Sequence, residues 1–400
     1  MSKTAVITKI NTICSLGIGF DALKKNIAKE IIPTKIQNFE LFDLPSEQYI
    51  YTAPDFEPKD ILGKKGLRTL DKATKILMSA IETGFKEFLE ALPDNERPGL
   101  MVGTAFGSIE SIGNFITDSV RFGVNSVNPG LFGNTVINSP AGNANIRYDL
   151  KNLSGTMATG LTSGLEGLIY TCDHIALGYL TSILYAGLEE ASVYQFAAAM
   201  NEKCLSPDGK MRPFAQSPLG YILGEGTGVM LVENKSFAQK HGREIIAEIS
   251  GYASGFDPNG SNFGYNSEGD VMEYVIREAL QKAKVTSEDI AFVSASANGT
   301  NGDLAEAKVI SRVFGDKTPV ACYKQKFGEA WGASGALCVA AAIADLQKKK
   351  VSPIYTDGYS KIDGINLVRK QELAIEKDHA LVLSFAPDGN CAAVVIKINK

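Results

Sequence analysis

Residues 157–168, MATGLTSGLEGL, have the pattern of a short strand, a tight turn and an amphipathic helix. In enzymes this arrangement presents one side chain at a helix N-terminus, where the helix dipole stabilises a thiolate or an oxyanion. The residue at the turn is Leu161, which has no nucleophilic atom. Thr162 and Ser163 are the nearest hydroxyls, and we expect them to cap the helix that they open.

Histidine and cysteine limit the other chemistry that the chain can do. Its three histidines, His174, His241 and His379, form neither an HExxH motif nor a close pair. The six cysteines are scattered and none has CxxC spacing, which is typical of reduced thiols rather than of a metal site or a disulfide framework. We therefore expect no metal site.

The glycines of residues 223–234, LGEGTGVMLVEN, precede a strand-like run. A dinucleotide-binding loop follows a strand and opens a helix, so this segment does not indicate nucleotide binding. The sequence also has no GxxxxGK[ST] motif, which excludes phosphate-binding loops of that type.

Composition excludes several partners. The 400 residues carry 40 Lys and Arg against 45 Asp and Glu, a net charge of −5, so no overall basic field attracts nucleic acid or an anionic membrane. The longest apolar run, residues 336–344, is far shorter than the about 18–20 residues that span a bilayer. The first residues lack the features of a secretory signal. We expect a cytoplasmic protein that binds neither nucleic acid nor a membrane.

Strand-like and helix-like segments alternate along the chain, which is typical of an α/β architecture with buried sheets. Apolar residues recur every three or four positions in residues 165–179, 272–283 and 304–314, which predicts helices there. The polar stretch 233–244 is the best boundary between two halves of the chain. About five predicted strands fall in each half, which is the pattern of a duplicated fold. The predicted strands are residues 5–13, 99–105, 155–159, 181–186, 229–233, 245–249, 290–295, 319–323, 380–384 and 392–398.

A series of motifs, in this order and spacing, resembles the β-ketoacyl synthases, which are condensing enzymes. The resemblance implies a thiolase-like α/β fold, with duplicated βαβαβ halves packed as layered α-β-α-β-α. It also implies an N-terminal half over residues 1–238 and a C-terminal half over residues 239–400. The motifs are residues 128–142 (NPGLFGNTVINSPAG), 158–164 (ATGLTSG), 184–190 (LYAGLEE), 212–214 (RPF), 224–233, 297–300 (ANGT), 324–335 and 384–390.

Active members of that family carry a Cys–His–His site, in which the cysteine takes an acyl chain and two histidines assist decarboxylation. Aligned on the motifs, the cysteine position is Leu161, and the two histidine positions are Asn298 and Glu329. The lysine five residues before the second histidine position is retained as Lys324. The resemblance thus implies that the chain is not an enzyme on its own and is a required subunit of an acyltransferase complex.

A chain that keeps the motifs of the family but has an altered site resembles the chain-length factors, which are the ketosynthase β subunits of type II polyketide synthases. These proteins pair with an active ketosynthase α subunit and help to line the tunnel into which the product grows. The resemblance implies a heterodimer that serves an acyl carrier protein in aromatic polyketide or aryl polyene synthesis. It implies no directly bound cofactor, because the phosphopantetheine belongs to the carrier protein.

The resemblance also implies which residues line the tunnel. In residues 107–120 the spacing places Ile109, Ile112 and Ile116 on one helix face, at positions that correspond to the gatekeepers of the family. The alternative is that this stripe is ordinary core. Further matching positions, at the inner wall and in the segment that reaches toward the partner, are Phe106, Leu131, Phe132 and Thr135.

Two more features follow from the resemblance. The gating loop, GFGG in active members, reads APDG here, so a stiff Pro387 replaces a mobile phenylalanine. Lys64, Lys65 and Arg68 form a basic cluster in the region that resembles the carrier-docking edge, and acidic carrier proteins favour such a patch. The alternative is an ordinary solvated surface.

Two other functions stay open. A stand-alone acyltransferase or hydrolase of the same fold would need a nucleophile near the pocket, for which only Thr162, Ser163 and Thr300 are candidates. A non-catalytic homodimeric scaffold would need no nucleophile at all.

Overall fold

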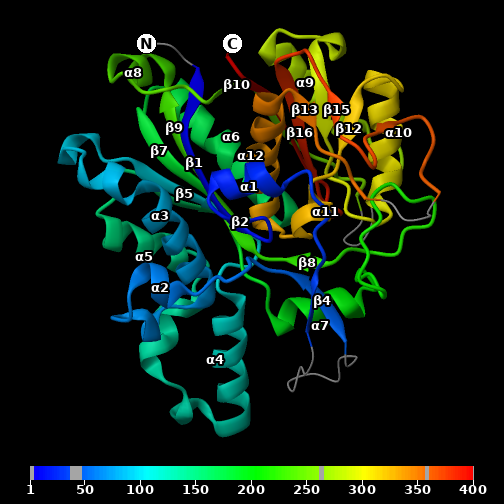
Figure 1. Cartoon of the computed structure of the whole chain (residues 1–400). Helices are drawn as coiled ribbons and strands as arrows, with labels where there is room; N and C mark the ends of the chain where they lie inside the picture. The colour runs from blue at the N-terminus through cyan, green and yellow to red at the C-terminus, as the bar shows by residue number, and fades with distance from the viewer. Residues whose placement is uncertain (1–3, 37–46, 261–264, 356–359, 400) are drawn as a thin grey trace.

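The computed structural model describes residues 4–36, 47–260, 265–355 and 360–399 (Figure 1). One large mixed sheet runs through the molecule in the order β14-β12-β11-β16-β17-β10-β1-β9-β7-β5-β6, with the short β2 (Gly17–Ile18) beside β1. The two halves of the chain meet where β1 (Ala5–Cys14) pairs antiparallel with β10 (Ala247–Phe256). Every segment that the sequence predicts as a strand forms one.

The remaining strands of the large sheet divide between the halves. Those of the N-terminal half are β5 (Gly99–Gly103), β6 (Ser154–Met157), β7 (Ser182–Glu189) and β9 (Gly226–Asn234). Those of the C-terminal half are β11 (Ile290–Ser294), β12 (Pro319–Ala321), β14 (Asn366–Leu367), β16 (His379–Phe385) and β17 (Asn390–Lys397).

Helices form three layers around this sheet (Figure 1). In the middle layer, α6 (Ser163–Ala176) and α12 (Gly332–Lys348) pack on each other, and both contact strands of the two halves. On the outside of the N-terminal half lie α3 (Lys72–Glu90) and α5 (Ser139–Tyr148), and on the outside of the C-terminal half lie α9 (Asp270–Ala283) and α10 (Gly302–Phe314). This arrangement confirms the predicted α-β-α-β-α layers.

Smaller elements surround the layers. A second sheet joins β3 (Thr34–Ile36), β4 (Gln48–Tyr51) and β8 (Leu223–Gly224), and a third pairs β13 (Lys350–Val351) with β15 (Leu373–Ala374). The other helices are α1 (Phe20–Asn26), α2 (Pro58–Leu62), α4 (Ile109–Phe122), α7 (Val193–Asn201), α8 (Lys235–Lys240) and α11 (Lys324–Phe327).

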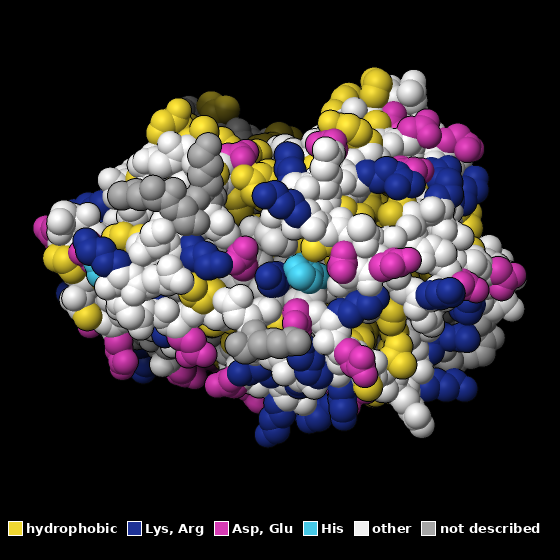
Figure 2. Space-filling model, turned by 90° about the horizontal axis from the view of Figure 1, so that it is seen from above, with side chains coloured by type: hydrophobic (Ala, Val, Ile, Leu, Met, Phe, Trp, Pro, Cys, Tyr) yellow, Lys and Arg dark blue, Asp and Glu magenta, His cyan; other side chains and the backbone are white. Residues whose placement is uncertain are grey.

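Two global expectations can be compared with the structure. On the face seen from above, Lys and Arg side chains are interspersed with Asp and Glu side chains (Figure 2). Among the residues that the structure describes, no helix combines the length and the apolar character of a membrane-crossing segment.

The middle layer depends on small residues, because helix α12 is buried from Gly332 to Leu346. A Cβ added to Gly164 of α6 would lie 2.3 Å from the carbonyl oxygen of Gly332. A Cβ added to Gly335 would lie 2.5 Å from the backbone nitrogen of Leu165. These glycines let the two backbones approach closely, so that the layers on both sides can close over them.

The first prediction concerns this contact. We expect Gly164→Ala to lower the free energy of unfolding by about 1–3 kcal/mol, because the added methyl group overpacks the helix interface. Gly142→Ala in α5 is the control, since a Cβ there meets nothing within 4 Å, and it should raise stability by about 0.5–1 kcal/mol through helix propensity alone. Urea titration followed by circular dichroism measures both. Equal stability of the two variants would contradict the close packing of α6 and α12.

Candidate functional site

The elbow before α6 forms as predicted, but its hydroxyls have other roles than expected. The chain leaves β6, turns through Gly160, whose φ is 65°, and places a buried Leu161 at the turn. The Ser163 hydroxyl donates to the Gly160 carbonyl at 2.7 Å and accepts from the Thr159 N–H at 2.8 Å. The Thr162 hydroxyl donates to the Thr159 carbonyl. Neither side chain caps α6, so the prediction of caps is wrong: the hydroxyls fasten the turn itself.

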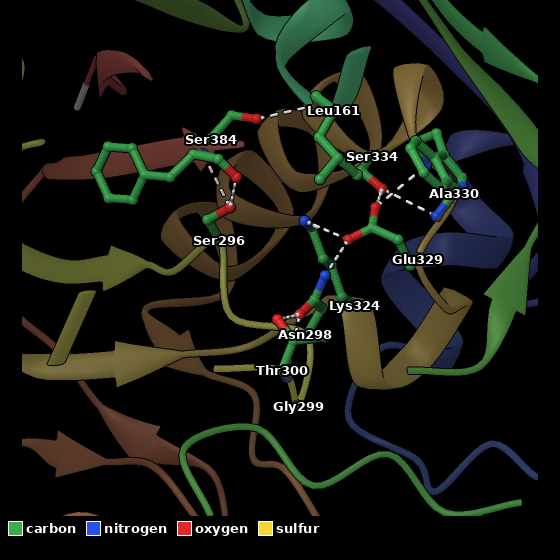
Figure 3. Close-up of polar contacts among 12 residues, drawn as sticks. Leu161, Ser296, Asn298, Gly299, Thr300, Lys324, Glu329, Ala330, Ser334 and Ser384 are labelled. Atoms are coloured by element: carbon green, nitrogen blue, oxygen red, sulfur yellow. Dashed lines mark hydrogen bonds and ion pairs between the residues drawn. The ribbon is translucent and has the colours of Figure 1, made fainter. Parts of the chain in front are cut away.

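Three of the four predicted site positions lie together (Figure 3). Asn298, from the loop after β11, donates its Nδ2 to Glu329 Oε2 at 2.8 Å. Lys324, from α11, donates its Nζ to the same oxygen at 2.8 Å. All three side chains are buried. Asn298, which lies 26 residues before Lys324 in the sequence, thus joins Lys324 and Glu329 in one hydrogen-bonded cluster.

The second carboxylate oxygen of Glu329 is also fully occupied. Oε1 accepts from the Ser334 hydroxyl at 2.8 Å and from the Trp331 N–H at 3.1 Å. Four donors use the whole acceptor capacity of a carboxylate. We call Lys324, Asn298, Glu329 and Ser334 the Glu329 network.

The charges of the Glu329 network balance each other. Burial opposes the charge of Lys324, but the charge and hydrogen bond of Glu329, together with the nearby Cys338 and Glu306, outweigh burial, so the pKa of Lys324 is raised above its ordinary value. Breaking a buried, hydrogen-bonded pair by removing one partner strands the other charge in the interior. The pair is therefore a strong constraint on where α11 and the start of α12 can lie.

Two further buried carboxyls hold the loop that carries Asn298. Asp303 accepts from the backbone N–H groups of Asn298 and Gly299, and Glu306 accepts from that of Ser296. Burial raises the pKa of Asp303 to about 6 and that of Glu306 to about 8. Both carboxyls therefore hold the backbone of the loop that carries Asn298.

A fourth buried carboxyl connects the site to the start of the predicted tunnel helix. Glu189, at the end of β7, accepts from the N–H groups of Ala105, Phe106 and Gly332. Burial raises its pKa to about 8. The ring of Phe106 lies edge-on to that of Trp331, with centroids 4.8 Å apart. Phe106 therefore joins the segment before α4 to the segment that carries Glu329.

Leu161 is the fourth predicted site position, and a hydrogen bond to its backbone holds it in place. Its carbonyl accepts from the Ser384 hydroxyl at 3.2 Å (Figure 3). Ser384 is the last residue but one of β16, and the β16–β17 turn that follows contains the half-buried Pro387. Asp388 of this turn comes close to Gly160, since a Cβ on Gly160 would meet its carboxylate at 3.0 Å.

The structure does not bring any histidine into contact with the alternative nucleophiles. His174 lies between the rings of Tyr170 and Tyr179, His241 faces Glu96, and His379 opens β16. The Thr300 hydroxyl donates to Asn298 Oδ1 at 2.7 Å, and the hydroxyls of Thr162 and Ser163 are bound within the elbow. Within the described ranges, no cluster of His, Cys, Asp and Glu could hold a metal ion.

The predicted tunnel residues lie on a helix that this chain does not bury. In α4 only Gly113 is buried, and the helix contacts mainly the neighbouring short helices, Val124–Ser126 and Pro129–Thr135, and α7. Ile109 and Ile112 are half-buried, and Ile116 is 56% exposed. As Figure 1 shows, α4 extends away from the sheet. The alternative that this stripe is ordinary core of the chain is wrong.

More apolar side chains lie exposed on the same part of the molecule, and we call them, with Ile116, the α4 face. Leu131 and Phe132, from the short helix after α4, are exposed, and Thr135 bonds back to the Phe132 carbonyl. The Phe132 ring lies edge-on to that of Phe115. The other exposed members of the face are Val120, Phe122, Val124, Val136 and Ile137.

The predicted carrier-docking residues lie apart from the Glu329 network. Lys64 and Lys65 follow α2, Arg68 lies in the next turn, and all three are exposed. Their docking role stays a prediction.

Sequence reasoning missed Ser334, Trp331 and Glu189. The signal was available for Ser334, since a buried Glu329 needs more donors than Lys324 and Asn298 supply. It was weaker for Glu189, because an acidic residue at the end of a buried strand has many possible roles.

The comparisons with known proteins agree on the family. Residues 50–238 match the model of the β-ketoacyl synthase N-terminal domain, and residues 246–356 match that of the C-terminal domain. The 3-oxoacyl-[acyl-carrier-protein] synthase 2 of Vibrio harveyi is 26% identical over 90% of this chain and 91% of its own. The enzyme of the same name from Rhizobium meliloti is 25% identical over 99% of each chain.

Solved structures confirm the predicted thiolase-like fold. The structure titled "The ishigamide ketosynthase/chain length factor" superposes with a TM-score of 0.90 over 100% of both chains, at 22% identity. A ketosynthase in complex with its chain length factor from Xenorhabdus doucetiae gives 0.84, at 18% identity over 99% of this chain and 98% of its own.

The relatives also correct one prediction. The prediction that the chain is not an enzyme on its own is wrong, because the curated relatives that match nearly its whole length are named as 3-oxoacyl-[acyl-carrier-protein] synthases. Leu161, Asn298 and Glu329 remove one route, acyl transfer to an elbow thiolate with imidazole assistance. That loss does not by itself exclude activity through other groups.

The second prediction concerns the Glu329 network. We expect Lys324→Met to lower the free energy of unfolding by about 3–5 kcal/mol, because it strands the buried Glu329 carboxylate. The double variant Lys324→Met/Glu329→Leu should recover much of this loss, since both charges are gone. The control is Lys308→Met, whose exposed pair with Glu268 spans 3.9 Å and should change stability by less than about 0.5 kcal/mol. Equal losses for Lys324→Met and Lys308→Met would contradict a buried network.

Proposed function

The chain belongs to the β-ketoacyl synthase family, and we propose that it serves as the chain-length-determining subunit of a heterodimeric ketosynthase in type II polyketide synthesis. The partner is a second ketosynthase chain that carries the elbow cysteine and both histidines. The growing chain is attached to the phosphopantetheine of an acyl carrier protein, and the product is an aromatic polyketide or an aryl polyene.

The observation that carries this proposal is the Glu329 network. In the motif alignment, two of its members, Asn298 and Glu329, take the positions of the family's histidines. The Glu329 carboxylate is saturated by four donors. A filled, charge-balanced network stabilises the frame and leaves Leu161 beside it without a thiol. Pairing with a chain that has an intact Cys–His–His site would supply the missing groups.

The α4 face supports a protein partner. Monomeric soluble proteins rarely expose a large contiguous apolar patch, and such patches mark interaction sites. Val120 and Phe122 at the end of α4 are exposed, and so is Phe132, whose ring packs against Phe115 of α4. Burial of these side chains on association would be favourable by about 25 cal/mol per Å² of apolar area.

The same face supports a role in product length. The half-buried Ile109 and Ile112 lie in the first turn of α4, which follows Phe106 in the chain. Phe106 contacts Trp331, whose N–H binds Glu329. A partner seated on this face would have these side chains between its own active site and this chain. A tunnel closed by them stops elongation when the growing chain fills its volume.

The titles of the similar structures point in the same direction. Two of them describe a ketosynthase together with a chain length factor. Because both structures are less than 25% identical to this chain, their similarity supports the fold alone. The proposed subunit role rests on the Glu329 network and the α4 face.

A third prediction tests the tunnel. In the reconstituted complex, we expect Ile109→Ala or Ile112→Ala to give products longer by at least one two-carbon unit, because each enlarges the tunnel. Ile112→Phe should shorten the product, and Ile146→Ala, at an exposed position of α5 outside α4, is the control. Mass spectrometry of the released products measures length. Unchanged length in all the α4 variants would contradict the tunnel.

A fourth prediction tests the interface. Phe132→Asp should weaken the heterodimer at least tenfold, about 1.4 kcal/mol, because it would bury a charge in an apolar contact. Leu177→Asp is the control, since Leu177 is 65% exposed and Phe132 is 62% exposed, and Leu177 follows α6 outside the α4 face. Sedimentation equilibrium gives both dissociation constants. A homodimer with no affinity for a ketosynthase would favour the scaffold alternative.

A further inference from the structure

The chain also contains a cavity of about 270 Å³, which the Glu329 network does not line. It lies between the segment before β3, the residues that precede Pro213, helix α11 and Tyr355. Its lining residues are Glu30, Ile31, Ile32, Pro33, Tyr51, Gly209, Lys210, Met211, Arg212, Gln325, Lys326 and Tyr355.

Lys326 is the unusual member of this lining. It is 1% exposed, and its ammonium donates to the Lys29 carbonyl at 3.0 Å and lies 4.3 Å from the centre of the Tyr355 ring. Among the described residues, it has no carboxylate within ion-pair distance. A carbonyl and a ring face stabilise a cation but do not neutralise it.

The contrast with Lys324, two residues earlier in the same short helix, is informative. Both lysines are buried. Lys324 forms an ion pair with Glu329 at 2.8 Å, whereas Lys326 lines the cavity without such a partner among the described residues. Burial lowers the pKa of Lys326 to about 8, with Asp345 and Glu30 acting in the opposite direction. Burying an ammonium without an ion-pair partner is costly.

The rim of the cavity adds positive charge. Three cationic residues, Lys210, Arg212 and Lys326, line it together with one carboxylate, Glu30. Asp208 pairs with Arg212, so these three cations face two carboxylates and the cavity keeps only a small positive excess. Asp208 holds the Arg212 guanidinium through two hydrogen bonds, of 2.9 and 2.5 Å, which fixes its position at the rim.

The rest of the lining is largely apolar. Ile31, Ile32, Pro33 and Met211 contribute aliphatic surface. The Tyr355 hydroxyl is already bound to the Ala28 carbonyl at 2.6 Å. A volume of about 270 Å³ lies just below the range of about 300–1,000 Å³ for drug-sized ligands, so a ligand here has few atoms beyond its head group.

We propose that this cavity binds a small organic anion, with a phosphate or carboxylate head beside Lys326 and a short apolar body against Ile31, Ile32 and Met211. The head group supplies the negative charge that Lys326 otherwise lacks. The site is separate from the Glu329 network, and its existence does not depend on the subunit role proposed above.

Isothermal titration of the full chain with phenyl phosphate, benzoate and inorganic phosphate tests the proposal. We expect saturable one-to-one binding of phenyl phosphate, of benzoate or of both, and the tighter probe identifies the head group. Absence of binding by both organic probes would overturn the proposal. Inorganic phosphate that binds as tightly as phenyl phosphate would overturn the apolar part of it.

Two variants, each with a matched control, locate the site. Lys326→Met should weaken binding about tenfold or more, because it removes a charge-assisted hydrogen bond, whereas Lys240→Met, at an exposed lysine of α8, should not. Ile32→Glu should also weaken binding by placing a carboxylate at the rim. Its control is Ile146→Glu in α5, since the two isoleucines are 83% and 85% exposed.

Ile32→Glu keeps the test valid if Lys326→Met fails to fold, because an exposed side chain changes without loss of core. Thermal unfolding by circular dichroism checks each variant. Unchanged affinity in Ile32→Glu, or in a folded Lys326→Met, would overturn the assignment of the bound anion to this cavity.

Discussion

The rest of the structure around the site depends on one carboxylate, that of Glu329. A buried ionised group is tolerated only when it is paired and fully hydrogen-bonded, and Glu329 satisfies both conditions with Lys324, Asn298, Ser334 and the Trp331 N–H. These donors come from three separate segments, so the pair fixes the loop after β11, helix α11 and the start of α12 relative to one another. The geometry of the site follows from that constraint.

The same constraint explains how site and surface are connected. The start of α12 is also held by Glu189, which binds the Gly332 N–H and the segment that leads to α4. Phe106 then lies against Trp331, and α4 continues outward to an apolar face that this chain leaves exposed. The buried site is thus connected to an exposed apolar face. The proposed role as one subunit of a heterodimer accounts for the altered site and for the exposed face.

Much of the fold could be predicted from the sequence, because buried strands and amphipathic helices have strong patterns. The ten predicted strands all form, but β10 continues to Phe256, where its alternating burial is harder to recognise than a continuous apolar run. Other strands of two to four residues, β2, β3, β4, β8, β13, β14 and β15, were missed, since pairing rather than local sequence defines them. Helix α6 ends at Ala176, so Tyr179 of the predicted stripe lies beyond it.

The site was only partly predictable. Aligned motifs named Lys324, Asn298 and Glu329, and folding brings them together. Sequence spacing could not show that Ser334 and Trp331 complete the network, nor that the stripe on α4 faces outward. From three replaced side chains we inferred that the chain is not an enzyme on its own. The curated relatives, which are named as synthases, contradict this inference, because replaced residues exclude one mechanism rather than all activity.

The most direct test of the central claim is the composition of the native complex. The tagged chain would be purified from its host without crosslinking, weighed by native mass spectrometry, and its partner identified by peptide sequencing. The account predicts a one-to-one assembly with a ketosynthase of similar size that has cysteine at the elbow and histidine at both following motifs. A homodimer or a monomer, with no such partner, would contradict it.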